Sequence, residues 1–342
     1  MSTCPYCTGS VADSIPGGEE LALAACLSCM NPLLQVRQGA GFEAQPLKGL
    51  PDVRKLAAPG SLGGELLKLL PKAIEELPVL PEISQRVMAM LRDPNMSMRD
   101  LADLVSQDQV IALKILQLAN SAMYGGLQEI TSLTAACARL GARTIANAVQ
   151  AIANGKLFIT GSVEFRDRMH NLWKHSVATA HCASEVGGLL AETNTDMLFV
   201  AGLVHEIGQL VILDIVSDQY RGPLAELRTA TDLLEEVLRG YSALAGLHVA
   251  QKWNLPQELR VTTYFHPAPH SVPIDGLKTR AHIISLSHAI ASASGYGVDA
   301  APLSLLNHPS TKLLGLTDLK LAVIRTELED KLKPLLQVTS AE

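Results

Sequence analysis

The chain has 342 residues, of which 48% are hydrophobic and 18% are charged, so it has material for large cores and too little charge for a disordered protein. Its length suits two packed units and a short appendage, and we expect more than one domain. The formal net charge of -6 gives no general attraction to nucleic acid or to an anionic membrane surface, which argues against both as partners.

The N-terminus carries no basic segment followed by an apolar one, so we find no secretory signal and expect a cytoplasmic protein. The most apolar long window covers residues 197–216 and is interrupted by four polar side chains. Those side chains would be costly in lipid, so the window predicts a buried helix of a soluble protein and no contact with a membrane. The interrupting residues are His205, Glu206, Gln209 and Asp214.

Four of the six cysteines fall within the first thirty residues as two C-x2-C pairs, Cys4 with Cys7 and Cys26 with Cys29. Zn2+ prefers four thiolates in a tetrahedral array, and each tight pair can supply two sulfurs from one turn. The spacing therefore predicts a zinc-ribbon-like module over residues 1–49 that holds a structural Zn2+. Because so short a segment lacks an adequate core, we expect it to unfold without the metal.

Two other interpretations of the cysteines stay open. The first pair, CPYC, also resembles the active-site motif of glutaredoxins, in which the first thiolate is activated at the N-terminus of a helix. No βαβ unit follows CPYC, which makes a redox role the weaker interpretation. A structural cluster without metal is the other alternative. Cys137 and Cys182 stand alone in alanine-rich helical stretches and are predicted to pack in a core.

Zinc ribbons often bind nucleic acid, but this module has no basic patch. Residues 1–60 hold four basic side chains against five acidic ones. We therefore expect the module to contact protein, either the helical body or a partner.

The rest of the chain predicts helices. Residues 50–70 are expected to form a linker and a short helix that ends before Pro71. Apolar residues recur at helical spacing over residues 71–153 and again over residues 154–335, which predicts two helical units. No strand-like alternation appears in either unit, so the predicted fold class is all-α, preceded by the small cysteine module. The expected helices cover residues 84–91, 101–105, 111–118, 132–140, 142–153, 164–190, 196–214, 230–238, 242–253, 277–293 and 316–332.

Two stretches of the second helical unit carry histidines, WKHSVATAHCASEV at 173–186 and LFVAGLVHEIGQLVI at 198–212. They resemble the histidine helices of the HD superfamily of metal-dependent phosphohydrolases, and more closely its HDOD branch. The resemblance runs from about residue 71 to residue 293 and implies a two-part helical HDOD domain, with the cysteine module outside it. Further matching stretches are LPVLPEIS (77–84), SQDQVIALKILQLANSAMYG (106–125), SLTAACARLGARTIANAVQA (132–151) and HVAQKWNLPQELRVTTYFHPAPH (248–270).

The resemblance also implies a site. An active HD site uses histidines and aspartates to hold one or two divalent ions that activate water. Here the aspartate of the His-Asp doublet is Glu206, and three other ligand positions are occupied by Leu244, Phe265 and His288. So few hard oxygens should bind Mg2+ or Mn2+ poorly, and we predict no catalytic activity. The residues that remain form a vestigial HD cluster, expected to be a buried polar group, with residual metal or ligand binding as the alternative. This cluster consists of His175, His205, Glu206 and His266.

The function implied by the resemblance is regulatory. HDOD proteins are associated with bacterial signal transduction, so we predict a non-catalytic module that acts through a protein partner or by sensing a small ligand. A metal-dependent phosphohydrolase of nucleotides or cyclic dinucleotides is the first alternative. A zinc-dependent nucleic-acid-binding regulator is the second.

Overall fold

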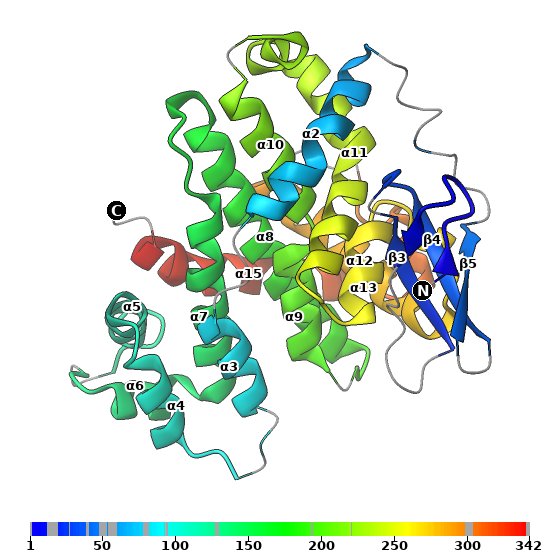
Figure 1. Ribbon diagram of the computed structural model, residues 1–342. Coiled ribbons are helices and arrows are strands. Elements are labelled where there is room, and N and C mark those ends of the chain that lie inside the picture. The colour runs from blue at the N-terminus through cyan, green and yellow to red at the C-terminus, as the bar shows by residue number, and fades with distance from the viewer. Residues whose placement is uncertain are drawn as a thin grey trace. The chain divides into compact units, whose positions relative to one another are not determined.

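Helices dominate the computed structural model, and a small sheet lies at the N-terminus (Figure 1). The prediction of a helical domain preceded by a small N-terminal module is confirmed. The structure describes residues 2–11, 20–26, 28–38, 41–47, 53, 60–77, 82–91, 93, 95–126, 130–192, 194–219, 221–297 and 304–339.

The chain forms two compact units, each assembled from separate segments. Two helices, α8 (Val163–Leu189) and α13 (Asp275–Ala291), begin in the first unit and end in the second. The contiguous domains expected at residues 1–49, 50–70 and 71–335 stay a prediction. The first unit comprises Met1–Leu77, Thr160–Met169 and Val204–Ser285, and the second comprises Pro78–Ile159, His170–Leu203 and Leu286–Glu342.

The N-terminal sheet belongs to the first unit. One antiparallel sheet has the order β3, β4, β5, with Leu23 opposite Leu34 and Gln35 opposite Ala44. Successive side chains of a strand point to opposite faces, and β3 is buried on both. Leu23 and Ala25 pack into one apolar cluster, while Ala24 joins another that contains the cysteines. The strands are β1 (Ser2–Thr3), paired with β2 (Ser10–Val11), and β3 (Leu21–Ala25), β4 (Pro32–Gln38) and β5 (Gly41–Pro46).

The helices of the first unit pack closely around α11. Gly208 of α10 faces the backbone of α11, where a Cβ would lie 1.9 Å from the Ser242 carbonyl oxygen. Only glycine allows that approach without movement of one helix. The other elements of this unit are α2 (Leu62–Glu76), α10 (Ile207–Asp218), η2 (Pro223–Arg228), α11 (Thr231–Lys252), α12 (Gln257–Phe265) and η3 (Pro269–Ser271).

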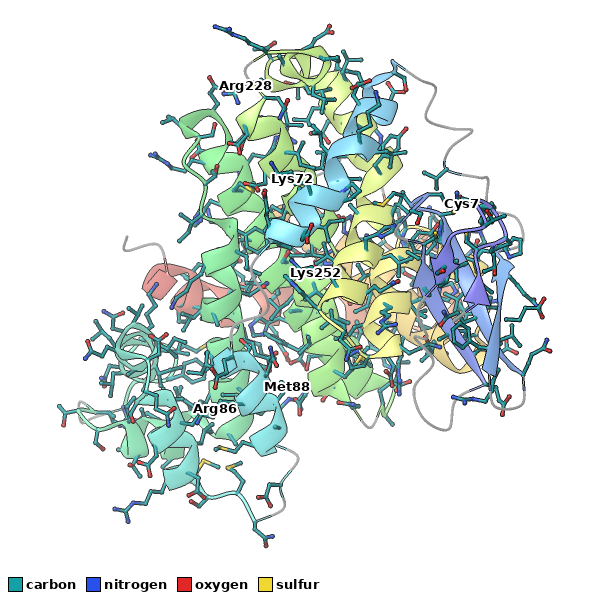
Figure 2. All side chains as sticks on the ribbon, in the orientation of Figure 1. Cys7, Lys72, Arg86, Met88, Arg228 and Lys252 are labelled. Atoms are coloured by element: carbon teal, nitrogen blue, oxygen red, sulfur yellow. The ribbon has the colours of Figure 1, made fainter. Side chains whose placement is uncertain are left out.

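Helix α2 continues past Pro71, although the sequence predicted its end before that proline. A proline removes one intrahelical hydrogen bond, but burial of Leu66, Leu70 and Ile74 on one face continues across it. The helix ends where the Lys252 ammonium group donates to the carbonyl oxygens of Ile74, Glu75 and Leu77, at 2.5, 2.5 and 2.9 Å (Figure 2). A cation at this end is favourable, because it contacts carbonyl groups of the last turn at the negative end of the helix.

The second unit contains the short helices predicted before residue 153. Ser97 and Asp100 form a capping box at the start of α4, and Asp108 caps α5, so these starts follow the rules of local sequence. Part of the LPVLPEIS stretch, residues 78–81, lies outside the described residues. The elements are α3 (Glu82–Leu91), α4 (Met98–Val105), α5 (Gln109–Ala119), α6 (Leu133–Leu140), α7 (Ala142–Gly155), η1 (Lys156–Phe158), α9 (Thr195–Val204), η4 (Ser292–Tyr296), α14 (Pro309–Leu313) and α15 (Asp318–Thr339).

The apolar window predicted as one helix is two helices, α9 and α10, with a turn at His205 and Glu206. In the described part of the chain, Thr195–Ser217 is the stretch long and apolar enough to cross a membrane, with a mean hydropathy of 1.8. It is 89% buried inside the protein, as expected for a core segment. The turn matters because it places the predicted His-Glu pair at a junction of helices.

Candidate functional site

The structure brings the four N-terminal cysteines together. Cys4 and Cys7 lie on the turn between β1 and β2, and Cys26 and Cys29 lie between β3 and β4. The Sγ atoms of Cys4 and Cys29 are 3.7 Å apart, those of Cys7 and Cys26 are 3.6 Å apart, and all four lie within 4.8 Å of one another. Four sulfurs at Zn–S distances of 2.3 Å in a tetrahedron are separated by about 3.8 Å. The arrangement fits one tetrahedral ion.

Each cysteine pair is followed by a residue with positive φ. Thr8 after Cys7 has φ 61°, and Met30 after Cys29 has φ 62°, although neither residue type favours the left-handed region. This conformation turns the chain sharply, and the N–H of Met30 donates to the Cys26 carbonyl oxygen at 2.8 Å. The two turns therefore share one local geometry that directs both sulfurs of a pair toward the same point.

The environment of the thiols does not match a glutaredoxin site. Burial raises the pKa of Cys4, Cys26 and Cys29, whereas the N–H of Gly9 lowers the pKa of Cys7. A glutaredoxin-type site instead activates the first cysteine of the pair at a helix N-terminus, and CPYC lies on a turn between two strands. Burial raises the pKa of a thiol because it disfavours the charged thiolate. A bound cation would stabilise the thiolate form of these three cysteines.

The cysteine module is joined to α11 and α12 by side-chain amides. The Gln251 amide accepts from the N–H of Ala25 at 2.6 Å and donates to the carbonyl of the same residue at 3.2 Å. The Gln257 amide accepts from the N–H of Leu23 at 2.9 Å and donates to the Leu21 carbonyl at 2.5 Å. These two amides take the place of a neighbouring strand along the free edge of β3.

The first unit holds three residues of the predicted HD cluster. His205 and Glu206 lie on the turn between α9 and α10, and His266 follows α12. All three are buried, and each has a ligand atom within 4.8 Å of the others. The rings of His205 and His266 meet edge to face, with centroids 4.9 Å apart. These three residues could therefore act on one ligand.

The hydrogen bonds of His266 define which of its nitrogens faces Glu206. Its Nδ1 lies 3.0 Å from the Thr263 carbonyl oxygen, which can only accept, so this nitrogen carries the hydrogen. Its Nε2 lies 3.4 Å from Oε1 of Glu206. In the neutral ring two acceptors would face each other there. A bound cation would relieve that repulsion.

The fourth predicted residue, His175, lies in the second unit and pairs with His288. Nδ1 of His175 donates to the Tyr296 carbonyl oxygen at 2.8 Å, which leaves Nε2 as an acceptor for Nδ1–H of His288 at 3.0 Å. The hydroxyl of Thr179 also approaches this Nε2, at 3.4 Å. The predicted cluster does not include His288, because the six-residue step from His282 places the two on different faces of one helix. Its place in the family motif was the signal that could have found it.

Two of the substituted ligand positions are occupied by buried apolar side chains. Leu244 on α11 and Phe265 on α12 are both buried, and Phe265 shares a cluster with Leu247, Val261 and Leu23. These two side chains offer no ligand atom to a metal ion.

Comparison with known proteins assigns the family. The family model of the HDOD domain matches residues 77–269, more than half of the chain. The chain belongs to the HDOD domain family. An HDOD domain protein with unknown function from Geobacter sulfurreducens has a similar crystal structure, with 25% identity, a TM-score of 0.64, and coverage of 81% of this chain and 98% of that one.

Other similarities are more distant. A Shewanella amazonensis structure with a suggested phosphohydrolase function is 22% identical, with a TM-score of 0.57 and coverage of 79% and 97% of the two chains. A Marinobacter aquaeolei structure with a suggested role in signal transduction is 18% identical, with a TM-score of 0.57 and coverage of 90% and 74%. These two share the fold. An uncharacterized Treponema pallidum protein is 25% identical over 210 residues, which span 58% of this HDOD chain and only 39% of that relative.

Proposed function

We propose that this HDOD protein is a non-catalytic regulator of bacterial signalling in the cytoplasm, which acts by binding a protein partner or a small ligand. The observation that carries the proposal is the composition of the HD cluster. Within the first unit, Glu206 is the one carboxylate of the described cluster, and its neighbours there are the imidazoles of His205 and His266. A cluster made mostly of imidazoles is a poor match for Mg2+, which prefers oxygen ligands.

We also propose that the cysteine module holds a structural Zn2+. Sulfur separations of 3.6 and 3.7 Å support this, because a tetrahedral zinc site needs nearly the same spacing. The burial that raises the pKa of three thiols supports it as well, since a dication favours the thiolate form. When bound, Zn2+ would hold the two turns of the module together, and no chemical step depends on it.

A metal-dependent phosphohydrolase is the alternative function. The facing acceptors of His266 and Glu206 favour it, because a cation would relieve their repulsion. Two imidazoles and one carboxylate, as in His205, His266 and Glu206, also suit Fe2+, Mn2+ or Zn2+ better than Mg2+. Activity would require one of these ions to be retained and to leave a position open for water.

Metal analysis combined with a turnover assay separates the two functions. We expect one zinc per chain after purification, and no hydrolysis of bis(p-nitrophenyl) phosphate or of a cyclic dinucleotide when Mn2+, Fe2+ or Mg2+ is added. Cys26→Ser should lose the zinc, and His205→Ala should keep it. Further metal equivalents together with turnover that disappears in His205→Ala would overturn the non-catalytic assignment. A zinc-free protein would overturn the structural zinc.

A further inference from the structure

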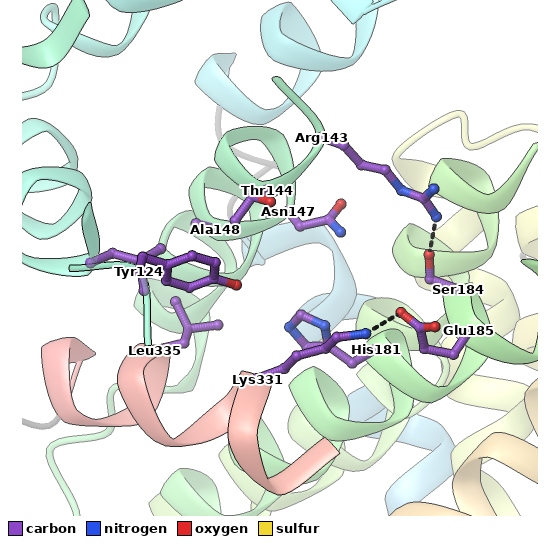
Figure 3. Close-up of a pocket in the computed structure, with 11 residues that line it drawn as sticks. Tyr124, Arg143, Thr144, Asn147, Ala148, His181, Ser184, Glu185, Lys331 and Leu335 are labelled. Atoms are coloured by element: carbon purple, nitrogen blue, oxygen red, sulfur yellow. Dashed lines mark hydrogen bonds and ion pairs between the residues drawn. The ribbon is translucent and has the colours of Figure 1, made fainter. Parts of the chain in front are cut away.

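A cavity of about 230 Å3 lies within the second unit, among α5, α7, α8 and α15 (Figure 3). None of the cysteines or of the predicted HD residues lines it. The side chains that face it include two cations, one carboxylate, one imidazole and one amide. They are Arg143, Lys331, Glu185, His181 and Asn147.

Among the side chains that line the cavity, cations outnumber carboxylates by one. Lys331 lies 2.5 Å from Glu185, and Arg143 donates to the hydroxyl of Ser184 at 2.7 Å. Burial, assisted by the positive charge of Lys331, lowers the pKa of His181 to about 4, so this ring is neutral at pH 7. Two cations and one carboxylate therefore remain among the lining groups.

Two further carboxylates contact these cations from outside the lining. Asp196 lies 3.4 Å from Arg143, and Glu327 lies 3.1 Å from Lys331, with exposed side-chain fractions of 36% and 48%. Arg143 and Glu185 are themselves 55% and 39% exposed, so solvent screens all of these pairs, and pairs this exposed are weak enough to leave both cations able to contact an anion. Arg143 also belongs to the first turn of α7, whose N-cap Gly141 supplies no side-chain hydrogen bond, so the helix end adds partial positive charge.

Asn147 contributes an acceptor that lacks a donor. Its Oδ1 is buried and has no hydrogen-bond partner within the described part of the chain. Buried polar atoms are normally satisfied, so a donor on a molecule in the cavity would complete the hydrogen bonding of this oxygen. A matching occupant therefore combines negative charge for the two cations with an O–H or N–H group for this oxygen.

We propose that this cavity binds a small protonated oxyanion, either hydrogen phosphate or a phosphate monoester. Lys331 and Arg143 contact its charged oxygens, and its O–H donates to Oδ1 of Asn147. The cavity has room beyond a phosphate group, and Tyr124, Leu118 and Leu335 line it with a ring and two apolar side chains. A monoester with a small apolar substituent uses this remaining surface.

Calorimetric titration of the full-length chain with inorganic phosphate, phenyl phosphate and sulfate tests the proposal. Sulfate matches phosphate in size but carries no proton at neutral pH, so it cannot donate to Asn147. We expect saturable 1:1 binding of phosphate, tighter binding of phenyl phosphate, and an affinity for sulfate that is lower by about tenfold or more. The absence of saturable binding by either phosphate compound, or equal affinity for phosphate and sulfate, overturns the proposal.

Matched variants locate the binding. Asn147→Asp places a carboxylate at the amide position, and Lys331→Met removes a cation, so each should lower phosphate affinity by about tenfold or more. Lys333→Met, an exposed change of equal charge on the same helix, should leave the affinity unchanged. His205→Ala should also leave it unchanged, which separates this cavity from the HD cluster. Unaltered affinity in both Asn147→Asp and Lys331→Met overturns the assignment.

Discussion

His248 connects α11 to the cysteine module through one buried side chain. Its Nε2–H donates to the Met30 carbonyl oxygen at 3.1 Å, and its Nδ1 is buried without a partner in the described residues. Burial lowers the pKa of His248 from 6.5 to about 4, and the bond to Met30 opposes that shift only in part. The imidazole is therefore neutral in the folded protein at pH 7.

This pKa predicts a pH dependence of stability. Between about pH 6.5 and pH 4 the unfolded state binds a proton that the folded state excludes, so the free energy of unfolding falls as the pH is lowered through that window. The contribution of the neutral His248 to the free energy of unfolding is fully present above pH 6.5, and about 3 kcal/mol of it is lost near pH 4. His248→Gln keeps a donor for Met30 and should flatten the profile by that amount in urea unfolding at pH 7.5, 6, 5 and 4. A slope equal to that of the unmodified protein would contradict the prediction.

At the level of residues, only part of the candidate site could be predicted from the sequence. The four cysteines are recognisable because each C-x2-C spacing is local, and their sulfurs meet. The pairing of His175 with His288 joins residues far apart in the chain and depends on the Tyr296 carbonyl oxygen. Such a contact leaves no trace in spacing. Asn147 was also missed, since an amide on a helix carries no signal until its surroundings are known.

At the scale of elements, the close packing of α10 on α11 depends on Gly208. A Cβ there would lie 1.9 Å from the Ser242 carbonyl oxygen and 2.6 Å from the Gly246 nitrogen, which are backbone atoms that cannot rotate away. Gly208→Ala should therefore force the helices apart and lower the free energy of unfolding by about 1–3 kcal/mol.

Gly240→Ala on α11 is the matched control, because a Cβ at that position meets nothing within 4 Å. It should stabilise the helix by about 0.5–1 kcal/mol through the higher helix propensity of alanine. Guanidinium unfolding of both variants measures the contrast. Equal effects of the two substitutions would show that the contact at Gly208 is unimportant.

Many of the helices were predictable, but α11 was expected as two helices, at 230–238 and 242–253, and α12 and α14 were missed. Helical periodicity identifies the short helices before residue 153, because each buries one apolar face. It fails at His205 and Glu206, where apolar residues on both sides hide the turn between α9 and α10. It fails at Pro71 too, where packing of α2 outweighs a local helix breaker. In both places tertiary contacts decide the backbone.

At the scale of the whole molecule, the cysteine module shares a core with the HD-like helices of the first unit. Leu23 and Ala25 of β3 belong to one apolar cluster with Leu247, Val261 and Phe265. The amides of Gln251 and Gln257 and the imidazole of His248 add direct hydrogen bonds to the same strand and the following turn. The state of the module should therefore determine the stability of α11 and α12.

Removal of the proposed zinc tests this coupling. Without the ion the buried thiols return to neutral and the turns that hold β3 lose their crosslink, so β3 should leave its position and expose Leu247, Val261 and Phe265. Hydrogen exchange of residues 244–266 should become at least about tenfold faster after chelation, because local opening costs less when packing is lost. Readdition of Zn2+ should restore protection. Fast exchange confined to residues 2–47, with α11 and α12 still protected, would show that the module is attached to the HDOD domain without stabilising it.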